Sequence, residues 1–123
     1  MAKAQEDKQQ IGLTAAGEEA IQVLVADGRF ASQTDAYRFA ISYAIGAGLD
    51  PADAPQGGYN TKFNALGTLE SGSSIRDLID ILGVGDTQRP FATAEKLAEL
   101  GVREIAKRLE GNETLAEIIV GAA

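Results

Sequence analysis

The sequence predicts a mainly α-helical protein with a short strand near its N-terminus. Apolar residues recur at intervals of three and four in several segments, which is typical of helices with one buried face. Capping residues precede these segments and glycines follow them. With 123 residues, 45% of them apolar, the chain suits one globular domain or two very small ones. We expect a strand and two helices in residues 1–50, a linker or loop at 51–58, and a helical extension over 59–123.

The short strand is predicted just before residue 14. Ile11 and Leu13 alternate with Gln10 and Gly12, so the two apolar side chains share one face. Lys8 falls on the opposite face, together with Gln10 and Gly12. Gly12 weakens the pattern because glycine has no side chain to pack. The polar face of this strand is expected to point away from the core.

Two helices are expected to follow the strand. Thr14 is a suitable N-cap for the first, and Gly28 is placed to end it. Ser32 is a suitable N-cap for the second, with Asp35 three residues later in a variant of the capping box. The second helix would end at Gly46 to Gly48. The apolar stripes are Ile21, Leu24 and Val25 in the first helix, and Tyr37, Ala40, Ile41, Ala44 and Ile45 in the second.

The second helix carries apolar side chains on more than one side. Phe39 and Tyr43 lie outside its main apolar stripe. A helix that is apolar nearly all round requires burial on several faces. Residues 1–50 cannot supply all of that cover. Either a second copy of the chain or the C-terminal half of this chain must provide the rest.

The C-terminal half is expected to be mainly helical. Residues 59–65 alternate, with Asn60, Lys62 and Asn64 on one face, and this pattern suits a second strand. The chain shows no internal repeat, and we recognise no family for residues 59–123. The helices expected here are one from Ser74 to Gly83, one capped by Thr93 and interrupted or kinked at Gly101, and a short last one that includes Leu115, Ile118 and Ile119.

Residues 8–48 resemble the ribbon–helix–helix family of the MetJ/Arc type. The resemblance lies in the order of strand, helix, glycine turn and serine-capped helix. It is carried by Ile11-Gly12-Leu13, by the turn Gly28-Arg29-Phe30-Ala31-Ser32, and by the helix residues Asp35-Ala36-Tyr37-Arg38-Phe39-Ala40. It covers about a third of the chain.

The resemblance implies a homodimer that binds DNA. Two chains would pair their single strands into an antiparallel ribbon, which fits the major groove of DNA. The outward residues Lys8, Gln10 and Gly12 would then face the bases, although Gly12 offers no side chain. Backbone N–H groups at the start of the second helix would hold a phosphate, which assigns that role to Ser32, Gln33 and Thr34.

The composition excludes several kinds of chemistry. Cysteine and histidine are both absent, so the chain has no disulfide, no thiolate nucleophile and no catalytic triad that uses histidine. The pairs Asp50 with Asp53 and Asp77 with Asp80 could bind Mg²⁺, but a loop pair and a solvated helix face explain them better. We expect no enzyme activity, no cofactor and no metal.

The charge bears on partners and location. The net charge of −7 opposes non-specific binding to nucleic acid or anionic lipid, although it permits a local basic patch. No apolar run of about 18 residues is present, and residues 1–10 are polar, so we expect a cytoplasmic protein without a membrane span.

Two functions remain open on the sequence. The first is a small dimeric DNA-binding regulator of a palindromic site. One form of such a regulator is an antitoxin whose acidic C-terminal extension, here residues 59–123, covers a basic protein. The second is a dimeric adaptor that binds proteins and no nucleic acid, which the net charge of −7 favours. Helix capping alone would also explain Ser32 and Thr34. Arg38 is expected to form an ion pair within the fold rather than to contact DNA.

Overall fold

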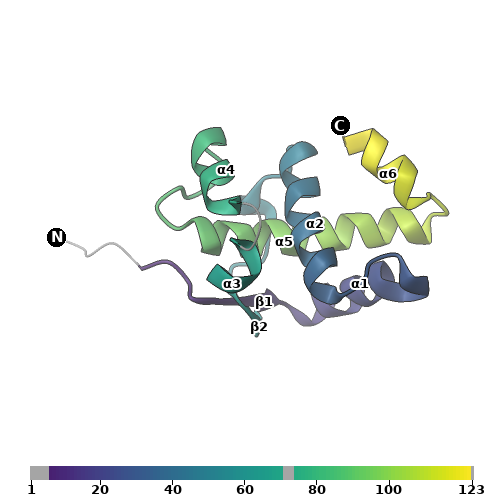
Figure 1. The fold of residues 1–123 in the computed structure, drawn as a ribbon, viewed down its shortest axis with the longest axis horizontal. Coiled ribbons are helices and arrows are strands. Elements are labelled where there is room, and N and C mark those ends of the chain that lie inside the picture. Colours follow the sequence, from purple (N-terminus) through teal and green to yellow (C-terminus); the bar gives the residue numbers. More distant parts are fainter. Residues whose placement is uncertain (1–5, 71–73, 123) are drawn as a thin grey trace.

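A computed structural model describes residues 6–70 and 74–122. The prediction of a mainly helical chain with a short N-terminal strand is confirmed. Figure 1 shows one long helix, α5, running through the molecule with the other elements arranged along it. The elements in chain order are β1 (Gln10–Leu13), α1 (Ala15–Val25), α2 (Gln33–Gly46), β2 (Asn60–Asn64), α3 (Ala65–Leu69), α4 (Ile75–Leu82), α5 (Pro90–Glu110) and α6 (Leu115–Ala122), with 3₁₀ turns at Ala26–Gly28 and Pro51–Asp53.

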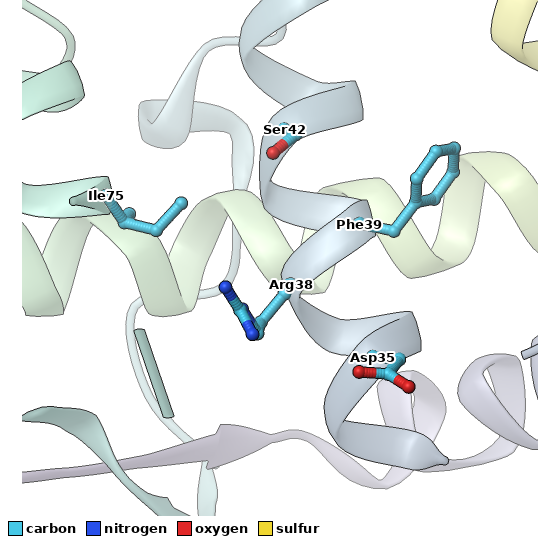
Figure 2. A pocket seen from close by; sticks show the side chains of 5 residues that line it. All are labelled: Asp35, Arg38, Phe39, Ser42 and Ile75. Atoms are coloured by element: carbon cyan, nitrogen blue, oxygen red, sulfur yellow. The ribbon is translucent and has the colours of Figure 1, made fainter. Parts of the chain in front are cut away.

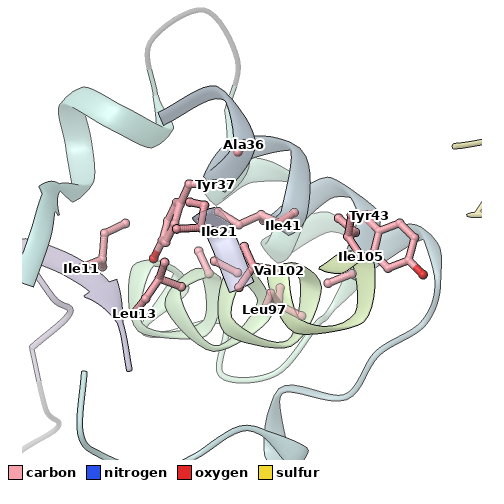
Figure 3. Packing of buried hydrophobic residues seen from close by; sticks show 14 of the residues in the cluster. Ile11, Leu13, Ile21, Ala36, Tyr37, Ile41, Tyr43, Leu97, Val102 and Ile105 are labelled. Atoms are coloured by element: carbon pink, nitrogen blue, oxygen red, sulfur yellow. The ribbon is translucent and has the colours of Figure 1, made fainter. Parts of the chain in front are cut away.

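The core is built around α5. This helix packs against both α1 and α2, and β1 lies beside it. Figure 3 shows side chains from β1, α1, α2 and α5 meeting in one cluster, among them Leu13, Ile21, Ile41, Leu97 and Ile105. The apolar sides of α2 are therefore covered by the C-terminal half of the same chain, which is one of the two covers that the sequence allowed. Residues 1–50 and 59–123 contribute to a single core.

The strands form a two-stranded antiparallel sheet within one chain. Gln10 lies opposite Asn64 and Leu13 opposite Asn60, with a register shift between Ile11 and Gly12. The second strand predicted within residues 59–65 is confirmed, and it pairs with β1 of the same chain. The single strand per chain that the family resemblance implies is wrong. Gly12 permits this pairing: a Cβ at this position would lie 1.7 Å from the carbonyl oxygen of Asn60.

The predicted caps of α1, α2 and α4 are confirmed. Thr14, Ser32 and Ser74 each accept a hydrogen bond from a backbone N–H three residues later. Gly83, with a φ of 63°, ends α4 in the left-handed conformation that glycine adopts without strain. These ends depend on neighbouring residues alone, so the sequence shows them directly.

The predicted start of α5 is wrong. The helix begins at Pro90, whose missing N–H costs nothing in the first turn. The carboxylate of Asp7 accepts the N–H groups of Phe91 and Ala92 at 2.8 and 2.9 Å and so caps the helix from the other end of the chain. The hydroxyl of Thr93 instead donates to the carbonyl of Asp86 at 3.0 Å.

The predicted interruption at Gly101 is also wrong, because α5 continues to Glu110. A Cβ at position 101 would lie 2.2 Å from the carbonyl oxygen of Ala40 in α2. Glycine at this position therefore serves the close packing of α2 on α5, and this benefit offsets its low helix propensity.

Candidate functional site

Two side chains of α5 and one of α2 form hydrogen bonds with the backbone of β1 and of the residue after it, at the edge of the strand that faces α5. The N–H of Gly12 donates to Glu95 Oε2 at 2.9 Å, and the N–H of Thr14 donates to Glu99 Oε1 at 2.9 Å. The hydroxyl of Tyr37 donates to the carbonyl of Gly12 at 3.1 Å. These three side chains replace the backbone of a neighbouring strand. Strand β1 is thus paired with β2 on one edge and with α5 and α2 on the other.

Two buried carboxylates lie at the centre of this arrangement. Glu95 is 2% exposed and Glu99 is fully buried. Lys8 forms an ion pair with Glu95. Arg103 donates from Nε to Glu99 Oε2 at 2.5 Å and from Nη2 to the Thr14 hydroxyl at 3.0 Å. Because hydrogen-bond donors and cations surround both carboxylates, their negative charge is compensated inside the protein.

The tyrosines near these carboxylates are kept neutral. Burial raises the pKa of Tyr37 well above its ordinary value, and the negative charges of Glu95 and Glu99 add to this effect. Burial and the same two carboxylates also raise the pKa of Tyr59. Both hydroxyls therefore act as hydrogen-bond donors at neutral pH. The arrangement holds β1 in place.

The sequence interpretation missed Glu95 and Glu99. Their partners in β1 and at Thr14 lie 83 to 85 positions away in the chain, so no local pattern reveals them. One signal was available, because two acids four residues apart lie among the apolar positions of a helix. Gly17 is a second trace of the same contact: a Cβ there would lie 2.3 Å from Glu99 Oε1.

The structure separates the three residues predicted to contact bases. Gln10 is exposed at the start of β1, opposite Asn64. Lys8 points to Glu95 on the α5 side. Gly12 is buried beneath β2. The exposed polar side chains of the two strands are Gln10, Asn60, Thr61 and Asn64.

Other polar residues of the ribbon have partners within the fold. Lys62 is half-buried and lies 3.4 Å from the carboxylate of Glu18 in α1. The side chain of Asn64 accepts the N–H of Gly67 at 2.8 Å and so caps α3. The side chains of Gln10 and Asn60 are exposed amides of β1 and β2, and neither takes part in the side-chain hydrogen bonds that the described residues show.

The residues predicted to hold a phosphate lie at the start of α2. The Ser32 hydroxyl accepts the N–H of Asp35 at 3.2 Å, while Gln33 and Thr34 are half-buried. One turn further along, Tyr37 bonds to β1, so the first turn of α2 lies beside the ribbon. The predicted phosphate residues and Gln10 therefore belong to neighbouring elements.

A shallow hollow lies further along α2. Figure 2 shows Asp35, Arg38, Phe39 and Ser42 on one side of this helix and Ile75, the first residue of α4, across from them. The hollow has a volume of about 220 Å³ and opens widely to solvent. It is wide and shallow, which distinguishes it from a small-molecule site that encloses most of its ligand.

Comparison of the chain with models of protein families, with curated proteins and with solved structures finds no match. Among the described residues, no helix is both long and apolar enough to cross a membrane. The same part of the chain contains no group of three or more Asp and Glu side chains that could hold a metal ion.

Proposed function

We propose that this protein is a small cytoplasmic regulator that binds DNA through the ribbon of β1 and β2. The observation that carries the proposal is the exposed amide on each strand, Gln10 on β1 and Asn60 on β2. A two-stranded antiparallel ribbon has dimensions that fit the major groove of B-DNA. Gln and Asn amides make paired hydrogen bonds to adenine. The ribbon therefore combines a suitable shape with suitable side chains.

The roles within the ribbon differ from those that the family resemblance implied. Gln10 keeps its proposed contact with a base, and Asn60 joins it from the second strand. Lys8 supports the ribbon through its ion pair with Glu95. Gly12 allows the close approach of β2. The base contacts in this proposal come from both strands of one chain.

The start of α2 would hold a phosphate of the same DNA. Its N–H groups carry partial positive charge, and helix N-termini are suited to bind phosphate and other anions. Ser32, Gln33 and Thr34 would make this contact beside the ribbon. Such contacts fix the orientation of a protein on DNA, while the amides of the ribbon would select the sequence.

Two copies of the chain would bind a palindromic site, one ribbon to each half-site. A homodimer of this kind would form through a surface other than β1. Both edges of β1 are already used, one by β2 and the other by the side chains of Glu95, Glu99 and Tyr37.

An adaptor that binds another protein is the second candidate. Its support comes from charge: Lys62 is paired with Glu18, and Arg108 with Glu113, in a chain whose net charge is −7. Cations that are paired in this way attract DNA phosphate less strongly. A basic partner protein would suit such a surface.

Fluorescence anisotropy with DNA tests the first proposal. The duplexes would come from the region upstream of the gene, with a random duplex for comparison, at about 50 and 200 mM salt. We expect selective binding that weakens as salt rises. Replacing Gln10 and Asn60 together by Ala should weaken selective binding by at least about tenfold, since each amide–base pair contributes roughly 1–3 kcal/mol.

Gln22→Ala is the matched control, because Gln22 is an exposed glutamine of α1 away from the ribbon. This variant should bind DNA as the unaltered protein does. The absence of binding at low salt, where electrostatic attraction is strongest, would contradict the DNA proposal. A stable complex with a basic protein would then favour the adaptor.

A further inference from the structure

Helix α4 carries more apolar side chains than its contact with α5 covers. Figure 1 shows α4 beside the first turns of α5, near one end of the molecule. Ile75 and Ile79 are buried and belong to the core cluster that α4 shares with α5. Leu78, Ile81 and Leu82 lie on the adjoining side of the helix, where Leu78 is half-buried and the other two are exposed.

Leu78, Ile81 and Leu82 form a continuous apolar strip, called the α4 strip below. Positions three and four apart are neighbours on a helix surface, so these side chains adjoin one another. Ile81 is 79% exposed and Leu82 is 53% exposed. Single exposed apolar residues are common on protein surfaces, whereas adjoining ones can form a binding surface. Among the described residues, the other exposed large apolar side chains, Leu66 and Ile119, belong to α3 and α6.

Two carboxylates without a partner border the α4 strip. Asp77 and Asp80 are exposed, and they lie four positions and one position before Ile81. Within the part of the chain that the structure describes, neither carboxylate takes part in an ion pair or a hydrogen bond. Arg76, the cation of the same helix, is already paired with Glu70 at 3.6 Å. The negative charge beside the strip is therefore not compensated by α4 itself.

This charge selects among the possible occupants of the α4 strip. A second copy that packed its own strip antiparallel to this one would bring the Asp77 and Asp80 carboxylates of both chains together, where they repel. An anionic lipid surface would be repelled in the same way. A partner with Lys or Arg beside an apolar face would be attracted, because opposite charges meet as the apolar surfaces leave water.

A helix suits the shape of the α4 strip. The strip runs along α4 for about one turn, and helices pack along rows of residues that lie three and four positions apart. Charged residues commonly border such contacts and set the choice of partner. The apolar strip and the carboxylates at its side therefore describe one half of a contact between two helices.

We propose that the α4 strip binds an amphipathic helix of another protein, one whose apolar face is bordered by Lys or Arg. The apolar side chains of that helix would cover Ile81 and Leu82, and its cations would lie beside Asp77 and Asp80. Binding at the α4 strip would serve the adaptor, the second candidate function on which it rests, and does not depend on DNA binding by the ribbon.

Titration of the full chain with synthetic peptides, followed by ¹H–¹⁵N NMR, tests this binding. The probe is a peptide of about 18 residues made of Leu and Lys, in which Leu recurs every three or four positions and forms one face of a helix. We expect saturable shifts at the backbone amides of α4. Two reference peptides, one with Glu in place of Lys and one with Leu and Lys in scrambled order, should not saturate these shifts.

Two substitutions separate the apolar contact from the charge. Ile81→Ser should weaken binding of the Leu–Lys peptide about tenfold, because less apolar surface is then removed from water. Asp80→Asn should weaken it by a smaller factor, about threefold at low salt, as expected for the loss of an exposed ion pair.

Ile119→Ser and Asp53→Asn are the matched controls. Ile119 is 47% exposed on α6, and Asp53 is an exposed aspartate of the 3₁₀ turn after α2. Both variants should bind the peptide as the unaltered protein does, and thermal melts would establish that all four variants fold. Ile81→Ser should also bind DNA normally, which separates this site from the ribbon.

Shifts on α4 that Ile81→Ser weakens and Ile119→Ser does not would support the proposal. It is wrong if the Leu–Lys peptide leaves the amides of α4 unshifted, if the scrambled peptide saturates them equally, or if Ile119→Ser weakens binding as much as Ile81→Ser. Sedimentation of the chain without peptide tests the other occupant, because a dimer that Ile81→Ser dissociates would assign the α4 strip to a second copy and contradict the proposal. A complex with a basic protein that Ile81→Ser leaves unchanged would support the adaptor function but contradict its location on α4.

Discussion

The two halves of α5 carry ion pairs in different surroundings. In the first half, Glu99 is fully buried and bonded to Arg103. Near the C-terminal end, Arg108 forms two hydrogen bonds with Glu113 at 2.7 and 2.8 Å, and both side chains are partly open to solvent. By geometry alone the second pair is as well formed as the first.

The two carboxylates differ in the further hydrogen bonds that they accept. Glu99 also accepts the N–H and the hydroxyl of Thr14, a residue that is only 8% exposed. If the carboxylate is removed, these donors are left unpaired inside the protein, which costs more than the bonds themselves contribute. When Arg108 and Glu113 separate, water solvates both. Burial, rather than the number of hydrogen bonds, should therefore rank the two regions in stability.

The largest effect is expected from Glu99→Ala. The substitution leaves the donors of Thr14 unpaired and opens a cavity at the contact with α1, so the free energy of unfolding should fall by about 3 kcal/mol. Urea denaturation followed by circular dichroism measures this loss. Glu99→Gln should cost less, because the amide oxygen still accepts one hydrogen bond.

Glu110→Ala is the control for this prediction, since Glu110 is an exposed glutamate of the same helix. Its free energy of unfolding should stay within about 0.5 kcal/mol of the unaltered protein. Equal losses for Glu99→Ala and Glu110→Ala would show that the buried carboxylate does not stabilise β1 as the structure implies.

The parts of the fold that could be predicted are those that depend on residues close together in the sequence. The caps at Thr14, Ser32 and Ser74 depend on residues within one turn, so the sequence shows them directly. The start of α5 was missed because its cap, Asp7, lies at the opposite end of the chain. Local propensity predicts a break at Gly101, but the Ala40 carbonyl that requires a glycine there belongs to another helix.

In the candidate site too, the features that follow from local sequence could be predicted, whereas the partners of β1 could not. The polar face of β1 could be predicted from alternation, and Gln10 is exposed as expected. The partner of β1 could not, because the family resemblance implies a second chain and alternation does not say which strand pairs with which. The contacts of Lys8 with Glu95 and of Gly12 with β2 follow from that pairing and were equally hidden.

A smaller effect is expected from Tyr37→Phe. The loss of the hydrogen bond to the Gly12 carbonyl should lower the free energy of unfolding by about 1 kcal/mol at neutral pH. The pKa of Tyr37 is raised in the folded protein above its ordinary value of 10.0, mainly by burial. The unfolded chain therefore loses this proton first, and stability should fall as pH rises above about 10.

Denaturation of Tyr37→Phe and of the unaltered protein at neutral and alkaline pH measures both effects. The fall in stability on the alkaline side should be smaller in the variant, because one of the groups responsible is absent. An equal fall in the two proteins would mean that Tyr37 is not held neutral by its surroundings.

The smallest effect is expected at the exposed end of α5. The hydrogen bonds from Arg108 lower the pKa of Glu113, so this carboxylate stabilises the folded state above the pKa of the unfolded chain, about 4.5, and loses that contribution as pH falls through its folded value. Glu113→Gln should therefore lower the melting temperature slightly at neutral pH, and this difference should shrink as the pH falls below about 4.5. High salt should also reduce the difference, because exposed charges are screened. If Glu113→Gln lowered the free energy of unfolding as much as Glu99→Ala does, burial would not distinguish the two ends of the helix.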